Sequence, residues 1–292
     1  MSDDGSPKIY LLPNLMTAGN LFCGFAATLK ILEGAMLLAA DPSAQDAAAR
    51  NYHAAIWLIL ASCIFDLLDG RLARLGGNES DFGREFDSLA DIVSFGVAPA
   101  LMVYRIVLHE FPRSGWMIAS LYLVCGALRL ARFNCLAAAN SKAANNEFKG
   151  FPIPAAAGVI ASITLFMLWL DDQNRDIGNG KWVLPPLMVF LAWMMFSGFR
   201  YPSFKAVNWR TKRSLPRFVL IVAVLATTAM FYEWMPAVIF VSYLLYGFLR
   251  PFLSRKMKAE IEEEDEDEDE PAAAGALERE GEPPPAGPTQ PS

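Results

Sequence analysis

Residues 66–74 read DLLDGRLAR and residues 83–91 read GREFDSLAD, and together they place four aspartates in a sequence that is otherwise strongly apolar. Asp66 and Asp69 are three residues apart, and Asp87 and Asp91 are four apart. Each pair therefore lies on one face of a helix. Carboxylates near hydrocarbon are costly unless a cation or a catalytic task compensates for them. The stretch predicts two helices that carry a functional acidic cluster at the edge of a membrane.

The rest of the chain predicts an all-α fold, a polytopic transmembrane helix bundle. The 292 residues are 54% hydrophobic. The apolar residues gather in runs of about 18–25 residues, which is long enough to cross a bilayer. We expect eight spans, at about 15–39, 52–72, 86–108, 115–136, 152–170, 182–199, 215–232 and 234–252.

The charge pattern separates this membrane body from an acidic C-terminal tail. From Glu260 onward the chain has thirteen acidic residues and one basic residue, although its overall net charge is only −6. The tail has too little apolar content to fold, so we expect it to be disordered. We therefore divide the chain into a cytoplasmic or interfacial segment (1–14), a transmembrane domain (15–254) and a cytoplasmic tail (255–292).

Lysine and arginine predict the orientation of the bundle. The loops on the side of the acidic cluster, with the residues after the last span, carry 17 of them, and the opposite loops carry 5. By the positive-inside rule, both termini and the cluster face the cytoplasm. The first apolar run lacks a preceding basic segment and a cleavage site, so we expect a retained span.

The cysteines lack metal-site spacing, and we expect buried free thiols at Cys23, Cys63, Cys125 and Cys135.

The acidic cluster suits divalent metal ions. Glycines between the two helices allow a sharp turn that brings all four carboxylates together. Four carboxylates in one pocket need compensation, which Mg²⁺ or Mn²⁺ supplies, and two such ions favour a displacement at phosphorus. Gly70 and Ala73 leave room beside the aspartates for a ligand, and Arg74 can hold a phosphate. The alternative is a set of unrelated acids paired with nearby arginines at a hinge.

The pattern Asp66-x₂-Asp69-Gly70-x₂-Ala73-Arg74-x₈-Gly83-x₃-Asp87-x₃-Asp91 resembles the full signature of the CDP-alcohol phosphotransferases. The resemblance implies a six-helix core, a homodimer and transfer of a phosphatidyl or related group from a CDP-linked donor to an alcohol, with release of CMP. It also implies that two metal ions are held by Asp66, Asp69 and Asp87, with Asp91 near them. Asp91 would be the general base for the acceptor hydroxyl. The donor nucleotide would contact Asp66, Gly70, Ala73, Arg74 and Gly83.

Other segments indicate the acceptor alcohol by resemblance. Residues 12–24, 86–99, 129–134, 148–154 and 201–205 resemble the phosphatidylserine-forming members of this family. This implies CDP-diacylglycerol and L-serine as substrates, no nucleic-acid partner and, with no targeting peptide, a place in a bacterial inner membrane among its lipids.

Serine brings a carboxylate that fixed cations and polar donors would bind. The candidates are Arg129, Arg132, Asn134, Lys149 and Lys205. Membrane anchoring or a contact with lipid phosphate explains the two arginines equally well, and anchoring is the simpler reading of the two lysines.

Three other functions remain open at this point. The same chemistry fits glycerol 3-phosphate, choline or inositol phosphate as acceptor. A cation transporter would also use carboxylates within the membrane, but the sequence shows no repeated half and the acids lie at span ends. A scaffold that recruits partners through the acidic tail would leave the four aspartates unexplained.

Overall fold

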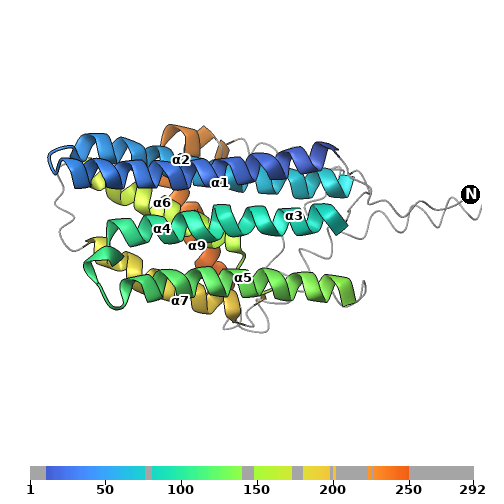
Figure 1. Cartoon of the computed structure of the whole chain (residues 1–292). Helices are drawn as coiled ribbons and strands as arrows, with labels where there is room; N and C mark the ends of the chain where they lie inside the picture. Colours follow the sequence, from blue (N-terminus) through green and yellow to red (C-terminus); the bar gives the residue numbers. More distant parts are fainter. Residues whose placement is uncertain are drawn as a thin grey trace, which may run out of the picture.

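The computed structural model describes residues 11–75, 81–139, 148–172, 180–197, 200–201, 223–224 and 226–249. Its long elements are all helices that run lengthwise beside one another (Figure 1), so the predicted all-α bundle is confirmed. Within the described ranges, the only strands are β1 (Phe148–Lys149) and β2 (Arg200–Tyr201), which pair antiparallel. This two-residue ladder joins a segment before α6 to one after α7 and does not change the fold class.

The helices follow the chain in a simple order. They are α1 (Leu11–Ala40), α2 (Gln45–Leu75), α3 (Asp81–Asp91), the π-helical segment η1 (Ile92–Val97), α4 (Ala98–Ile106), the 3₁₀ turn η2 (Leu108–Glu110), α5 (Gly115–Ala139), α6 (Ile153–Asp172), the 3₁₀ turn η3 (Gly180–Val183), α7 (Leu184–Phe196) and α9 (Met235–Leu249). Because α1 begins at Leu11, the end of the predicted 1–14 segment forms its first turn.

Among the described residues, four helical stretches are long and apolar enough to cross a membrane. They are Leu12–Ala40, Phe82–Ile106, Gly115–Cys135 and Ile153–Asp171, and they coincide with the first, third, fourth and fifth expected spans.

The other expected spans have different counterparts. The second lies in α2, which has 31 residues but carries aspartates and arginines towards its end. The sixth and eighth correspond to the shorter apolar helices α7 and α9. Half of the expected span 215–232, together with the acidic tail, lies outside the described residues.

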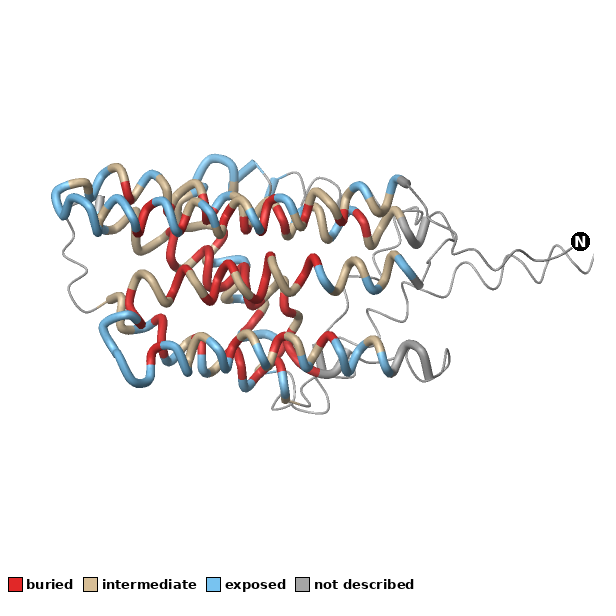
Figure 2. The backbone as a smooth tube through the Cα atoms, viewed as in Figure 1, coloured by how far each residue is buried: buried red, intermediate tan, exposed pale blue. Residues whose placement is uncertain are grey.

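The core lies between the helices, while large apolar side chains also cover the outside. Buried residues line the inner faces of the helices along the middle of the bundle (Figure 2). On the outer faces, Phe22 and Met36 are each 70% exposed and Trp193 is 52% exposed. A water-soluble domain rarely exposes so many large apolar side chains, whereas a helix surface in contact with lipid requires them.

A tight hairpin joins α1 to α2. Asp41 Oδ1 accepts hydrogen bonds from Ser43 Oγ at 2.7 Å and from the Ser43 N–H at 2.9 Å. These two bonds hold the pKa of the Asp41 carboxyl below its usual value. The turn makes the two long helices antiparallel neighbours, so the start of α1 and the end of α2 lie at the same end of the bundle (Figure 1).

The helix that starts with α3 changes from α to π geometry immediately after Asp91. In η1 the Ala98 N–H donates to Val93 O, five residues back. Pro99 follows, and it has no N–H to donate to Phe95 O. The hydroxyl of Tyr122 on α5 donates to that oxygen at 3.0 Å, so the freed carbonyl is satisfied by a neighbouring helix. Single-turn π segments occur often at functional sites.

The chain enters α6 through a segment fixed against α7. Gly150 has φ +94°, a conformation that favours glycine, and a Cβ there would overlap Met195 O. The next residue, Phe151, is fully buried and its N–H donates to Met194 O at 3.1 Å. The location of β1 beside the end of α7 follows from these contacts.

All four cysteines are free thiols, as expected. Their predicted burial holds fully only for Cys23. Cys63 and Cys125 are half-buried. Cys135 in α5 is exposed, so the prediction that this thiol is buried is wrong. Position in an apolar run does not decide burial here, because a lipid-facing helix exposes apolar residues on its outer side.

Candidate functional site

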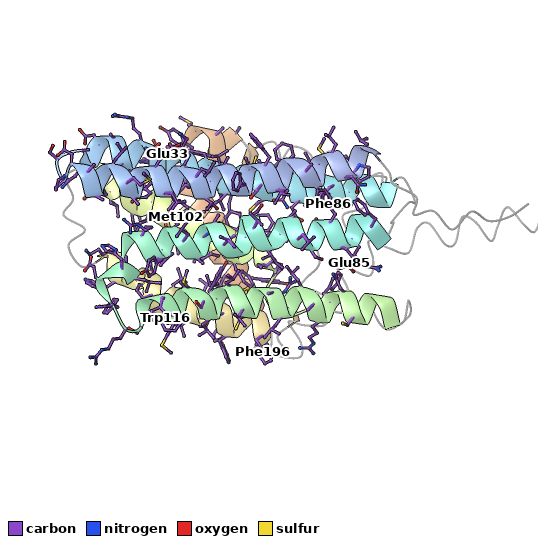
Figure 3. All side chains as sticks on the ribbon, viewed as in Figure 1. Glu33, Glu85, Phe86, Met102, Trp116 and Phe196 are labelled. Carbon is purple, nitrogen blue, oxygen red and sulfur yellow. The ribbon has the colours of Figure 1, made fainter. Side chains whose placement is uncertain are left out.

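Three of the four signature aspartates meet between the end of α2 and the start of α3. One carboxylate oxygen from each of Asp66, Asp69 and Asp87 lies within 4.8 Å of the other two. Asp69 is 5% exposed, and the other two are half-buried. The three aspartates of α2 and α3 thus converge as the sequence predicts, at the end of the bundle where Figure 3 labels Glu85 and Phe86 of α3, and α1 packs against both of these helices.

The donor set of this cluster fits a hard divalent cation. All three ligating groups are carboxylates, which Mg²⁺ and Mn²⁺ prefer to nitrogen or sulfur. Asp87 Oδ1 is shielded from solvent and has no hydrogen-bond partner within the described part of the chain. A buried carboxylate oxygen without a donor is costly, and a bound cation would satisfy it. The cluster is therefore able to hold a metal ion.

Asp91 lies beside this cluster but is not one of the three converging groups. It is one helical turn beyond Asp87, and only 5% of its surface is exposed. Its electrostatic neighbours include Asp66, Asp87 and Asp69. Asn20 Nδ2 donates to Asp91 Oδ1 at 3.1 Å. The fourth aspartate is therefore a separately held carboxylate next to the three.

Helix α1 supplies two hydrogen bonds to the aspartates that the sequence reasoning missed. Thr17 Oγ1 donates to Asp69 Oδ2 at 3.0 Å and also lies 3.2 Å from Pro13 O. Asn20, three residues later, holds Asp91 as described. Thr17 is 3% exposed and Asn20 is fully buried. The signal was present in the sequence, since two polar residues three apart in an apolar span mark one functional face.

The small residues of the signature lie at the same end of the bundle. Gly70 follows Asp69 directly in α2 and is half-buried, and Gly83 lies in the first turn of α3. The backbones of Ala73 and Arg74 form the last turns of α2, while their side chains lie outside what the structure describes.

The candidate acceptor residues divide into those near the aspartates and those elsewhere. Arg129 on α5 is half-buried, has Asp91 and Asp66 among its electrostatic neighbours, and its Nε has no hydrogen-bond partner among the described residues. Arg132 is exposed. Asn134 Nδ2 donates to Ser88 Oγ on α3 at 2.8 Å, which fixes α5 beside the acidic helix.

The side chains of the two lysine candidates lie outside the part of the chain that the structure describes. The backbone of Lys149 lies in β1, but its side chain is outside the described part, and Lys205 lies wholly outside it. Among the candidates whose side chains the structure describes, Arg129 is the cation that has aspartates of the signature, Asp91 and Asp66, as electrostatic neighbours.

The fold and site define a polytopic helical membrane protein with a carboxylate cluster at one end of the bundle. Residues 10–198 match the family described as CDP-alcohol phosphatidyltransferase. The chain belongs to this family, and the match covers all four aspartates together with Thr17 and Asn20. The signature resemblance is therefore confirmed.

Similar proteins bear names from the same reaction class. The chain is 36% identical over 243 residues to the CDP-diacylglycerol–serine O-phosphatidyltransferase of Helicobacter pylori, covering 83% of this chain and 91% of that protein. It is 34% identical over 196 residues to the Bacillus subtilis protein of the same name, covering 66% and 91%. It is 30% identical over 204 residues to the archaetidylserine synthase of Methanothermobacter thermautotrophicus, covering 69% and 74%.

Proposed function

We propose that this protein transfers the phosphatidyl group of CDP-diacylglycerol to the hydroxyl of L-serine, which yields phosphatidylserine and CMP. The observation that carries the proposal is the convergence of Asp66, Asp69 and Asp87 within 4.8 Å inside the matched family region. Serine as the acceptor is supported by the names of the three relatives given above, all of which refer to serine although one of these proteins is archaeal.

The three converging aspartates are the proposed metal ligands, with Asp91 beside them. Two ions, Mg²⁺ or Mn²⁺, would neutralise charge on the pyrophosphate and on the oxygens that enter and leave phosphorus. Thr17 holds one oxygen of Asp69, so it leaves the other carboxylate oxygen of that residue for ligation. Such bonds from outside the ligand shell orient the ligands and support their affinity for metal.

Asp91 is the proposed general base. A serine hydroxyl needs a positioned acceptor for its proton as it attacks phosphorus. Asp91 is buried, is held through one oxygen by Asn20, and is not one of the three aspartates whose oxygens converge. Its second oxygen is the one that would take the proton. Of the two histidines of the chain, His53 lies thirteen residues before Asp66 in α2, which is about 20 Å along that helix, and His109 lies in η2, eighteen residues after Asp91.

The donor nucleotide would lie against the small residues of the signature. Gly70, Ala73 and Gly83 keep side-chain bulk away from the carboxylates, and Arg74 would pair with the pyrophosphate. Arg129 is the proposed cation for the serine carboxylate, because a shielded guanidinium nitrogen without a hydrogen-bonded partner is costly and an anion would offset that cost. Arg132, Asn134, Lys149 and Lys205 remain lesser candidates for the acceptor or for lipid phosphate.

The acyl chains would stay in the bilayer while the headgroup chemistry takes place at its edge. The distribution of Lys and Arg supports a cytoplasmic site with both termini on that side, and we propose the bacterial inner membrane as its location. The homodimer that the family resemblance implies stays a prediction, which the mass of the purified protein in detergent would test.

The proposal is tested by CMP release from the purified protein in mixed micelles. The reaction contains CDP-diacylglycerol, Mg²⁺ or Mn²⁺, and one labelled alcohol at a time: serine, glycerol 3-phosphate, choline or inositol phosphate. We expect label from serine alone to enter lipid, and a chelator to stop the reaction until metal is restored. Transfer to another alcohol would overturn serine as the acceptor. If none of the four alcohols led to release of CMP, the proposed reaction itself would be overturned.

A further inference from the structure

Asn20 is a fully buried amide within the apolar helix α1. Its side chain crosses to α3, where Nδ2 donates to Asp91 Oδ1 at 3.1 Å. A primary amide is costly to bury unless all of its polar atoms are paired. An apolar side chain of the same size would avoid this cost, so the presence of an amide at this position needs an explanation.

The amide of Asn20 is satisfied on only one side. Its Oδ1 is shielded from solvent and has no hydrogen-bond partner among the described residues. A buried carbonyl oxygen without a donor lowers stability. The contact with Asp91 thus comes at a cost to folding, which argues that Asn20 serves the carboxylate rather than the stability of the bundle.

The backbone around Asn20 is fixed relative to the helix that carries Asp91. Ser94 Oγ, in the π segment that follows Asp91, donates to Asn20 O at 2.9 Å. One turn further along α1, a Cβ at Gly24 would overlap the backbone and side chain of Ser94. Only glycine permits this approach of α1 to η1. Both ends of the Asn20–Asp91 bond are therefore held by close backbone packing.

The direction of this hydrogen bond selects one oxygen of Asp91. An ionised carboxylate only accepts, so the amide N–H must face it, and Oδ1 is the oxygen that receives the bond. Oδ2 is then left for a proton from the substrate. Thr17 acts on another aspartate, Asp69, so the two α1 side chains serve different carboxylates.

We infer that Asn20 is a positioning residue, which holds Asp91 so that its Oδ2 faces the hydroxyl of the acceptor alcohol. The inference rests on the proposed function, because it assumes that Asp91 takes the acceptor proton. It predicts that Asn20 contributes to turnover and not to donor binding, metal binding or stability.

The test compares Asn20→Leu and Asn20→Ala with wild type and with Ser162→Ala. Leucine is close in size to asparagine but has no donor, and alanine adds no bulk if leucine does not fold. Ser162 on α6 is also fully buried, and its Oγ donates to Val159 O within its own helix, so it is a matched control. Measured are kcat for serine, KM for CDP-diacylglycerol, Mn²⁺ affinity and the thermal midpoint.

We expect kcat to fall about tenfold to a hundredfold in both Asn20 variants, the usual effect of losing a hydrogen bond to a charged group. KM for the donor and Mn²⁺ affinity should stay within about twofold, because neither Asp91 oxygen is among the three that converge. The thermal midpoint should fall no further than in Ser162→Ala.

Three results would overturn the inference. They are an unchanged kcat in a folded variant, a loss confined to donor KM or Mn²⁺ affinity, and a loss of activity that only follows loss of folded protein. Wild type is assayed alongside the variants. An inactive wild type would mean that the proposed function is wrong. An active wild type together with a fully active Asn20→Leu would mean that only this inference is wrong.

Discussion

Asp91→Asn tests the proposed mechanism most directly, because it removes the base and leaves the shape. The side chain keeps its size, and the amide introduced at this position can turn its oxygen towards Asn20 Nδ2, so the 3.1 Å contact is preserved. The change also removes one of four neighbouring negative charges. We therefore expect a folded protein that is at least as stable as wild type.

The expected loss is in the rate of transfer. General-base catalysis contributes about 10²- to 10⁴-fold, so kcat for serine should fall by that factor. At about 1.36 kcal/mol for each tenfold change, this raises the barrier by about 3–5.5 kcal/mol. Binding of CDP-diacylglycerol and of Mn²⁺ should persist, because Asp66, Asp69 and Asp87 remain in place.

The assay follows CMP release with labelled serine in micelles, together with donor and Mn²⁺ binding to the same preparation. Asp46→Asn is the matched control. Asp46 is an exposed aspartate in the first turn of α2, at the end of that helix opposite to Asp66 and Asp69. A variant at Asp91 that turns over within about threefold of wild type would refute its role as base. Loss of Mn²⁺ binding instead would reassign Asp91 as a metal ligand.

Three further predictions follow from the contacts around the site. Thr17→Val keeps the side-chain shape but removes the bond to Asp69, and Mn²⁺ affinity measured by titration should fall about tenfold to a hundredfold. Tyr122→Phe leaves the Phe95 carbonyl without its donor, and the free energy of unfolding should fall by about 1–3 kcal/mol in a denaturant titration. Deletion of residues 260–292 should leave kcat unchanged, because the tail lies outside the matched family region.

Each of these has its own control and its own adverse result. Ser62→Ala removes a buried hydroxyl that donates to Ile59 O within α2, and it should leave Mn²⁺ affinity as it is. Equal affinities in Thr17→Val and wild type would remove Thr17 from the metal site. Unchanged stability in Tyr122→Phe would mean that Phe95 O finds another donor. Loss of activity in a folded tail deletion would show that the tail takes part in catalysis.

The sequence predicted the acidic cluster because its spacing is local. Intervals of three and four residues place Asp66 with Asp69, and Asp87 with Asp91, on single helix faces without any tertiary information. The glycines between the two pairs favour a turn that brings the pairs together, and the convergence of Asp66, Asp69 and Asp87 agrees with that expectation. For the same reason, the four long apolar helices could be read from run length alone.

The contribution of α1 was not predicted, because it depends on contacts between residues far apart in the chain. Thr17 meets Asp69 across 52 residues, and Asn20 meets Asp91 across 71. Periodicity identifies a polar face but not the helix that the face meets. The exposed Cys135 shows the same limit, since an apolar run does not tell which of its sides faces lipid.

What the amino-acid order determined by itself was the class of fold, the family and the identity of the four carboxylates, because each depends on run length, composition or spacing within a few turns of helix. The tertiary structure alone decided how the four differ. Packing of α1 against α2 and η1 leaves Asp66, Asp69 and Asp87 open to a shared cation and holds Asp91 apart on the amide of Asn20. Helix packing fixes which atoms face one another, and that geometry is the basis for proposing three aspartates as metal ligands and Asp91 as the base.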